Sequence, residues 1–241
     1  KALEQIAASH TGSDTITIVL PKGRYDFYPE GAAQKEYFIS NHDQDNPKLV
    51  GLPFENMKNI VFDGQGSELI FHGRMLPVSL INSENCTLKN FSIDFENPHI
   101  SQVKVLENDT VAGAITYEVA PWVEYEIRDS VFYAKGEGWE HSPAWGIAFE
   151  GDTKRLVYTT SDISIGSKGV SEISPRVIKS AKWNNKKLIP GTVVAMRGWG
   201  RPTPGIFVSY DTNTILENIQ VHYAEGMGLL AQMSENITLD K

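Results

Sequence analysis

Two copies of one segment decide the fold, and they lie at residues 85–90 (NCTLKN) and 213–218 (NTILEN). Shorter copies begin at Asn59 and Asn236, so copies that directly follow each other are 26 and 23 residues apart. Residues of the inward-facing type stand at offsets 1, 3, 6, 8 and 10 from the first Asn: Cys86, Leu88, Phe91, Ile93 and Phe95, then Thr214, Leu216, Ile219, Val221 and Tyr223. This alternation predicts strands with one shared core and places Leu88 and Leu216 on adjacent strands.

The alternation slips once, which predicts a corner where one residue leaves the pleat. That corner is offset 5, occupied by Gly64, Asn90 and Asn218, residue types that tolerate left-handed backbone. Coils of 23 to 26 residues without helical periodicity favour an all-β fold, a right-handed parallel β-helix. The alternative is an ordinary β-sandwich with chance asparagines.

The second and third copies start 128 residues apart, about a hundred more than one coil needs. Short alternating segments between them, separated by turn residues such as Asn108-Asp109 and Gly151-Asp152, predict an inserted antiparallel β-barrel or sandwich. We therefore expect three parts: an N-terminal helical cap at residues 2–9 with the first coils up to 98, the insertion at 99–209, and a return to the coils at 210–241.

Composition excludes several classes of protein. Lys and Arg number 22 against 30 Asp and Glu, a net charge of −8, which argues against binding to nucleic acid. No apolar run approaches the roughly 20 residues that cross a membrane, and the first residues do not resemble a signal peptide. The lone Cys86 allows neither an internal disulfide nor a CxxC metal site. P-loop, Rossmann, HExxH and GxSxG motifs are absent, and His42-Asp43-Gln44-Asp45 lacks the Gly and Glu of a calcium loop.

Offset 9 is expected to point outward, and Glu68, Asp94 and His222 occupy it. Tyr223 and Glu225 continue the coil of His222. Carboxylates, an imidazole and an aromatic ring are the groups of a sugar site, in which acids protonate leaving groups and rings stack on pyranose faces. The alternative is a solvated polar surface.

A second cluster, RGWGRPTP at residues 197–204, ends the insertion. Gly and Pro give this segment the character of a shaped loop. Trp199 is a candidate for stacking on a sugar, and Arg197 is a candidate donor to its hydroxyls. The alternative is a structural plug between insertion and coils.

Several segments together resemble glycoside hydrolase family 110, and the resemblance runs over essentially the whole chain. They are KGRYDFYP (22–29), ISNHDQ (39–44), FDGQG (62–66), FHGRM (71–75), NFSIDF (90–95) and ENIQVHYAEGMG (217–228). The resemblance implies a parallel β-helix with β-barrel insertions. It also implies a secreted or periplasmic α-galactosidase that releases terminal α-1,3-linked galactose with inversion and without a metal or cofactor.

The chain departs from the family in one respect, because it contains no adjacent Asp-Asp pair. The resemblance associates catalysis with such a pair, so we expect the catalytic residues beyond residue 241 and no turnover by this chain alone. Asp94, Arg197, Trp199, His222, Tyr223 and Glu225 are predicted to bind substrate. An open solenoid end exposes strand edge and apolar core, so copies of the chain are expected to associate.

Two rival functions belong to other classes. One is a non-catalytic carbohydrate-binding module, favoured by the missing aspartate pair. The other is a polysaccharide lyase or polygalacturonase relative, which shares the solenoid but, as a lyase, requires clustered carboxylates for calcium and a basic Arg or Lys.

Overall fold

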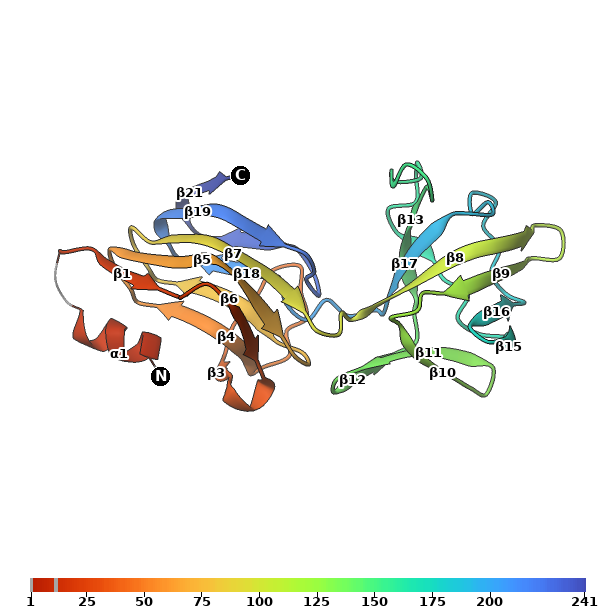
Figure 1. Cartoon of the computed structure of the whole chain (residues 1–241), viewed down its shortest axis with the longest axis horizontal. Coiled ribbons are helices and arrows are strands. Elements are labelled where there is room, and N and C mark those ends of the chain that lie inside the picture. The colour runs from red at the N-terminus through yellow and green to blue at the C-terminus, as the bar shows by residue number, and fades with distance from the viewer. Residues whose placement is uncertain (1, 11–12) are drawn as a thin grey trace. The chain divides into compact units, whose positions relative to one another are not determined.

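The computed structural model describes residues 2–10 and 13–241 (Figure 1). The chain forms two compact units, one made of Lys1–Pro98 with Gly200–Lys241 and the other of His99–Trp199. Strands dominate both units, which confirms the all-β prediction. Within the described residues, no helix has the length and apolar character needed to cross a membrane.

In its described residues, the first unit contains two sheets of mainly parallel strands. The first sheet runs in the order β1 (Ile16–Val19), β5 (Ile60–Phe71), β7 (Thr87–Phe95), β19 (Thr212–Val221) and β21 (Glu235–Asp240), with β2 (Arg24–Phe27) also paired to β5. The second runs β20 (Leu229–Gln232), β18 (Ile206–Ser209), β6 (Leu76–Ile81), β4 (Lys48–Glu55) and β3 (Ala33–Lys35), with only β3 antiparallel. Helix α1 (Ala2–Ser9) packs Leu3, Ile6 and Ala7 against the core of this unit.

The repeated segments stack in the predicted register. Leu88 on β7 pairs with Phe62 on one side and with Leu216 on the other. Phe91 and Ile93 likewise pair with Ile219 and Val221. The apolar members of each copy face the same core, so the prediction that Leu88 and Leu216 occupy adjacent strands is confirmed.

The first Asn of every copy adopts a left-handed conformation, with φ between 54° and 57° at Asn59, Asn85, Asn213 and Asn236. Their side chains form a hydrogen-bonded ladder across the repeated segments. Each amide nitrogen donates to the amide oxygen of the preceding copy, over 3.1 Å from Asn85 to Asn59 and 2.9 Å at the two later steps. The asparagine therefore serves two purposes: it allows the turn, and it ties each repeated segment to the previous one.

A second ladder joins the predicted corner. Asn218 donates to Asn90, and Asn90 donates to the carboxylate of Asp63, each over 2.9 Å. In the first copy the corner prediction is wrong, because the left-handed residues are Gln65 and Gly66, not Gly64. Gly64 instead packs so closely that a Cβ there would lie 2.7 Å from the carbonyl oxygen of Asn90.

The shifted corner also changes which of the outward-pointing residues at offset 9 lie side by side. A bulge between Asp63 and Ser67 moves the register, so that Ile70 pairs with Asp94 while Glu68 pairs with Ser92. The predicted alignment of Glu68 with Asp94 is therefore wrong. Two additional residues in β5 account for this difference.

Asp211 lies buried at the turn between the sheets. Its carboxylate accepts the Ser83 N–H over 2.9 Å and the Thr214 hydroxyl over 3.1 Å. Burial raises the pKa of Asp211 to about 6, although these two hydrogen bonds act in the opposite direction.

The second unit is antiparallel throughout. Its larger sheet runs β14 (Ile163–Ser164), β13 (Trp145–Phe149), β17 (Val193–Arg197), β8 (Ile100–Asp109), β9 (Ala114–Val119), β16 (Val177–Ser180) and β15 (Val170–Ser174); its smaller sheet runs β10 (Glu124–Arg128), β11 (Val131–Gly136) and β12 (Trp139–His141). The core of the unit, including Tyr117, Phe132, Trp139 and Trp183, comes from its own residues. The chain returns to the first unit at Gly200 and not at 210, because β18 already pairs with β6.

The first testable consequence concerns the longer ladder. Asn85→Ala removes two side-chain hydrogen bonds and leaves an alanine, which tolerates left-handed backbone less well than asparagine, so we expect a loss of about 2–4 kcal/mol in the free energy of unfolding by urea. Asn85→Gly keeps the backbone conformation accessible and is expected to lose less. Equal losses for both variants would show that backbone conformation plays no part.

The second testable consequence concerns the buried carboxylate of Asp211. Its pKa of about 6 lies above the ordinary 3.8, so its contribution to stability is complete below pH 3.8 and is lost as the pH rises through 6. Asp211→Asn cannot ionise, and we expect it to stabilise the protein by about 2–3 kcal/mol at pH 8 and not at pH 4. Asp63→Asn is the control of opposite sign, because the Asn90 amide and the Gln65 N–H hold the pKa of Asp63 below its ordinary value. A pH-independent effect of Asp211→Asn on unfolding would contradict the assignment.

Candidate functional site

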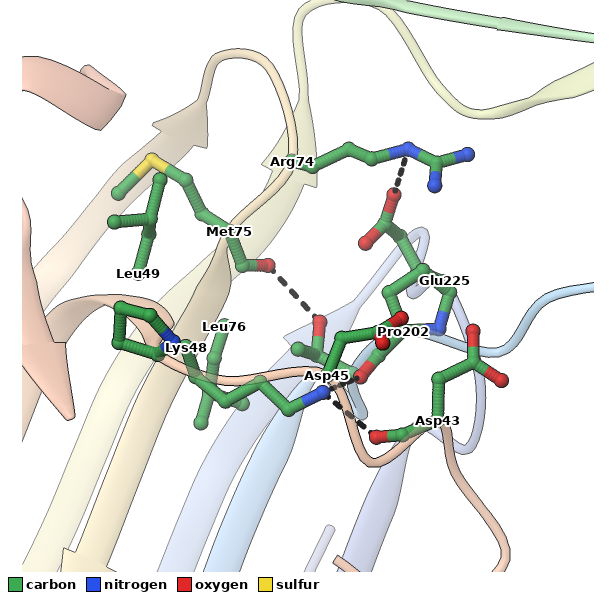
Figure 2. A pocket seen from close by; sticks show the side chains of 11 residues that line it. Asp43, Asp45, Lys48, Leu49, Arg74, Met75, Leu76, Pro202 and Glu225 are labelled. Atoms are coloured by element: carbon green, nitrogen blue, oxygen red, sulfur yellow. Dashed lines mark hydrogen bonds and ion pairs between the residues drawn. The ribbon is translucent and has the colours of Figure 1, made fainter. Parts of the chain in front are cut away.

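A polar hollow lies in the first unit where turns lead from one parallel sheet to the other (Figure 2). Its volume is about 260 Å³. Four chain segments contribute its polar side chains: Asp43, Asp45 and Lys48 before and at the start of β4, Arg74 between β5 and β6, Thr203 before β18, and Glu225 between β19 and β20. Carboxylates and cations thus converge on one space.

Lys48 joins two of these segments. Its ammonium donates to the carbonyl oxygens of Asp43, over 2.7 Å, and Pro202, over 3.1 Å. Burial lowers the pKa of Lys48, while the carboxylates of Asp43, Asp45 and Glu225 oppose that shift. The lysine fixes the floor of the hollow and supplies positive charge to it.

Glu225 is the most enclosed carboxylate of the hollow, with its side chain only 1% exposed. Its Oε1 atom lies 3.5 Å from Nε of Arg74, whose side chain is 44% exposed. Figure 2 shows the arginine extending above the carboxylate. An enclosed carboxylate beside an accessible guanidinium offers an acceptor and a donor for ligand hydroxyl groups.

His42 fixes the turn that carries Glu225. Its Nδ1 lies 3.0 Å from the Ser40 carbonyl oxygen, to which it can only donate, so Nε2 accepts the Met227 N–H over 3.2 Å. Gly226 lies against this ring, and a Cβ at that position would come within 2.2 Å of Nε2. The position of Glu225 therefore depends on the contact between His42 and Met227 and on a neighbour without a side chain.

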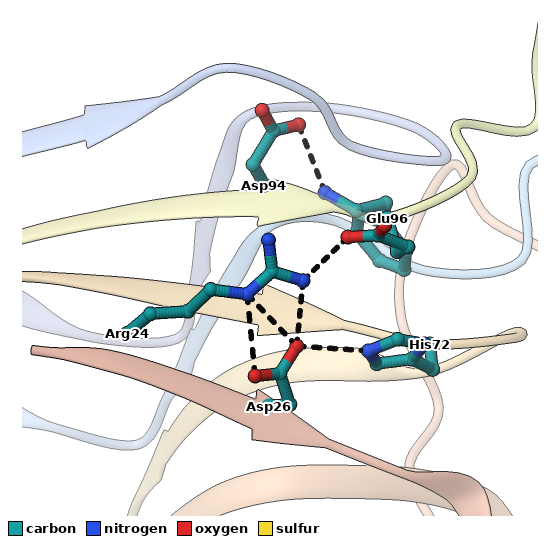
Figure 3. A network of polar contacts seen from close by, with 6 residues as sticks. Arg24, Asp26, His72, Asp94 and Glu96 are labelled. Carbon is teal, nitrogen blue, oxygen red and sulfur yellow. Dashed lines mark hydrogen bonds and ion pairs between the residues drawn. The ribbon is translucent and has the colours of Figure 1, made fainter.

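A network centred on Arg24 lies at the ends of β2 and β7 in the same unit (Figure 3). The guanidinium donates to both oxygens of Asp26 and, over 2.5 Å, to Glu96. His72 Nε2 lies 3.0 Å from Asp26, and the Tyr28 ring stacks on His72 with centroids 4.1 Å apart. Arg24 first, and His72 second, lower the pKa of Asp26 to about 2.

One ligand atom from each of Asp26, His72 and Glu96 lies within 4.8 Å of the others, a donor set that could hold a metal ion. Arg24 binds both carboxylates, however, and already supplies the positive charge that a cation would bring. We therefore interpret the cluster as an arginine-centred network.

The structure distributes the predicted site residues over four places. Glu225 lies in the hollow. Asp94 lies within β7, and His222 directly follows the neighbouring strand β19, where the His222 N–H donates to the carbonyl oxygen of Ile93. The carboxylate of Asp94 accepts the N–H of Phe95 over 2.8 Å. Tyr223 is partly buried and packs edge-on against Phe95 at the side of the core.

Arg197 and Trp199 belong to the second unit. Arg197 Nη2 binds both oxygens of Asp162, and Trp199 contacts Trp145 edge to face. The sequence prediction missed Asp43, Asp45, Lys48, Arg74 and Thr203 as lining residues. The only feature of the sequence that could have indicated these residues was their position, because most of them lie in turns between strands.

Comparison with known proteins agrees with this architecture. The family described as GLAA-B beta-barrel domain I matches residues 101–194, which lie within the second unit. The chain is also 72% identical over 240 residues to alpha-1,3-galactosidase B of Parabacteroides distasonis, covering 100% of this chain and 39% of the relative. The chain matches the N-terminal portion of glycoside hydrolase family 110.

Other relatives show similar coverage. Alpha-1,3-galactosidase B of Phocaeicola vulgatus is 63% identical over 242 residues, which make up 100% of this chain and 41% of that protein. Alpha-1,3-galactosidase A of Bacteroides fragilis is 30% identical over 236 residues, 96% of this chain and 38% of that protein. The chain thus spans about two fifths of the length of these relatives, and the family predicted from its motifs is confirmed.

The contacts of His42 with Gly226 and Met227, which hold the turn of Glu225, give a test of the site. Gly226→Ala would place a methyl group against His42, so we expect the turn to shift and the resonances of residues 224–228 and His42 to move in NMR spectra. Gly228→Ala is the matched control, because no atom lies within 4 Å of a Cβ at that position. Similar spectra for both alanine variants would contradict the role assigned to His42.

Proposed function

We propose that this chain is part of an inverting exo-α-galactosidase that removes terminal α-1,3-linked galactose from glycans, and that the Glu225 hollow contacts the galactose. The observation that carries the proposal is the convergence of Glu225, Arg74 and Lys48 on one small space. The names of the relatives supply the reaction.

The size and chemistry of the hollow suit one sugar residue. Its volume of about 260 Å³ lies just below the roughly 300–1,000 Å³ of pockets for larger small molecules. Galactose presents hydroxyl groups that both donate and accept hydrogen bonds. Glu225 and Asp43 can accept from them, and Arg74 can donate to them.

The proposal includes the architecture that would support the reaction. We infer that the paired parallel sheets of the first unit are coils of a right-handed parallel β-helix. Strands on successive coils lie about 4.8 Å apart and alternate coils about 10 Å. These spacings bracket the roughly 6.5–9.5 Å between the acid and the base of an inverting glycosidase.

In this mechanism, one carboxylic acid protonates the glycosidic oxygen while the other carboxylate removes a proton from the water that attacks the anomeric carbon. We assign Glu225 a substrate-binding role, in which it orients the galactose by accepting hydrogen bonds from its hydroxyls. We place the enzyme outside the cytoplasm, where glycans with terminal galactose occur.

The test exchanges this chain for the matching 240-residue segment of the Parabacteroides distasonis relative. We expect the chimera to hydrolyse α-1,3-galactobiose, to release β-galactose first in NMR spectra, and to tolerate chelators. α-Galactose as the first product would contradict inversion. Binding without turnover would favour a carbohydrate-binding module, and loss of activity with chelator would favour the metal-dependent lyase class.

Within the chimera, Glu225→Gln keeps the shape of the side chain and removes a charged acceptor. We expect kcat/KM to fall about ten- to hundredfold, corresponding to roughly 1.5–3 kcal/mol. Glu68→Gln is the matched control, because this exposed carboxylate lies on the outer face of β5. Equal small effects of the two substitutions would show that the hollow does not contact substrate.

A further inference from the structure

We propose that the second unit carries a glycan-binding surface of its own, built on Trp199 and Trp145 and edged by the Arg197–Asp162 ion pair. The ligand class is a pyranose with an apolar face, such as a galactose residue of a glycan. All four side chains belong to residues 99–199, so the proposal does not depend on hydrolysis.

The first observation is the exposure of an aromatic ring. Trp199 is 75% exposed, whereas Trp139 and Trp183 of the same unit are buried in its core. Burial of a tryptophan side chain contributes more free energy than burial of most other side chains. A solvent-exposed tryptophan ring beside the end of a strand is therefore typical of a binding site.

The second observation is that the two rings form a defined arrangement. Trp145 and Trp199 lie edge to face, with centroids 5.2 Å apart and planes at 83°. This geometry is favourable for an aromatic pair and presents two surfaces nearly at right angles. A sugar ring stacked on one indole would therefore have the other indole beside it.

The third observation is rigidity. Trp145 begins β13 and pairs directly with Arg197, the last residue of β17. Between Arg197 and Trp199, Gly198 lies so close to His141 that a Cβ would be 3.1 Å from its ring, and the Gly198 carbonyl accepts a hydrogen bond from Arg197 Nη1. A surface held by sheet pairing and close packing loses little conformational entropy when a ligand binds.

The fourth observation is a polar edge with fixed donors and acceptors. Arg197 Nη2 lies 3.0 and 3.2 Å from the two oxygens of Asp162. Both side chains keep part of their surface in water, and their remaining N–H groups and lone pairs can bind neighbouring hydroxyls of a sugar.

These features select a sugar over a protein partner. Stable protein interfaces bury about 1,200–2,000 Å², far more than two tryptophan side chains provide. In galactose, the axial hydroxyl at C4 leaves the C–H groups of C3, C4 and C5 together on one face. That face can stack on an indole while the equatorial hydroxyls reach the ion pair.

The experiment uses the 241-residue chain and its tryptophan indole N–H signals in NMR spectra, assigned by single substitution. Titration with methyl α-galactoside and with α-1,3-galactobiose is expected to shift the signals of Trp145 and Trp199 saturably, with a dissociation constant on the order of 1–10 mM. Trp199→Ala is expected to weaken the response at Trp145 by at least about tenfold.

Trp122→Ala is the matched control, because Trp122 is a 45% exposed tryptophan of the same unit. Thermal unfolding of each variant reports whether the fold is kept, and Trp199→Phe, which retains a ring, is expected to bind with intermediate strength. Equal shifts at Trp122 and Trp199, or no saturable shift at Trp145 and Trp199, would overturn the proposal.

Glu225→Gln separates this proposal from the proposed function. We expect that variant to keep the Trp145 and Trp199 shifts even where contact with the hollow is lost. Loss of both signals in Glu225→Gln would show that the tryptophans respond only to events at the hollow and would overturn the second surface. Loss of hydrolysis with unchanged Trp145 and Trp199 shifts would support a second surface that is separate from the hollow.

Discussion

Hydrogen bonds between side-chain amides of successive repeated segments are the interaction on which the first unit depends. A stack of parallel strands needs a tight turn at the same place in every repeated segment, and Asn59, Asn85, Asn213 and Asn236 each adopt the left-handed conformation that this turn requires. Their amides then bind one another, which fixes the register of the strands that follow. The apolar pairing of Leu88 with Phe62 and Leu216 depends on that register.

The long insertion between the second and third repeated segments leaves this register intact, and the second unit explains how. Its entering strand β8 and its leaving strand β17 are neighbours, with Ile100 paired to Arg197. The two ends of the unit are therefore held together by its own sheet, and its core is built from its own residues. Because the folded unit closes the loop itself, the insertion of about a hundred residues adds little entropic cost to the pairing of the strands on either side.

Periodicity made much of this predictable. Alternation with period two and the repeated asparagines gave the strands, their core residues and the neighbours of Leu88. They could not give the bulge at Gln65 and Gly66, because two additional residues inside one strand leave the pattern intact on either side. The return of the chain at Gly200 was not predicted because every residue of β18 is buried. Its sequence, Ile206-Phe207-Val208-Ser209, therefore lacks the alternation of apolar and polar residues that marked the other strands.

The site was less predictable than the fold for a related reason. Glu225 was predicted because it follows a repeated strand, whereas Arg74 lies in a turn and Lys48 begins β4, a strand outside the repeated copies. Their convergence depends on the packing of strands and turns that are far apart in sequence. Only the three-dimensional arrangement brings these groups into one hollow.

The ladders also give the stack an electrical direction. Each asparagine donates toward the preceding strand: Asn236 to Asn213, Asn213 to Asn85, Asn85 to Asn59, and Asn59 to the carbonyl oxygen of Ser13. The second ladder runs the same way and reaches the carboxylate of Asp63. Aligned amide dipoles reinforce one another as peptide dipoles do in a helix, with the positive end toward the first strands. Asp63 lies at that positive end, so its negative charge stabilises the whole row.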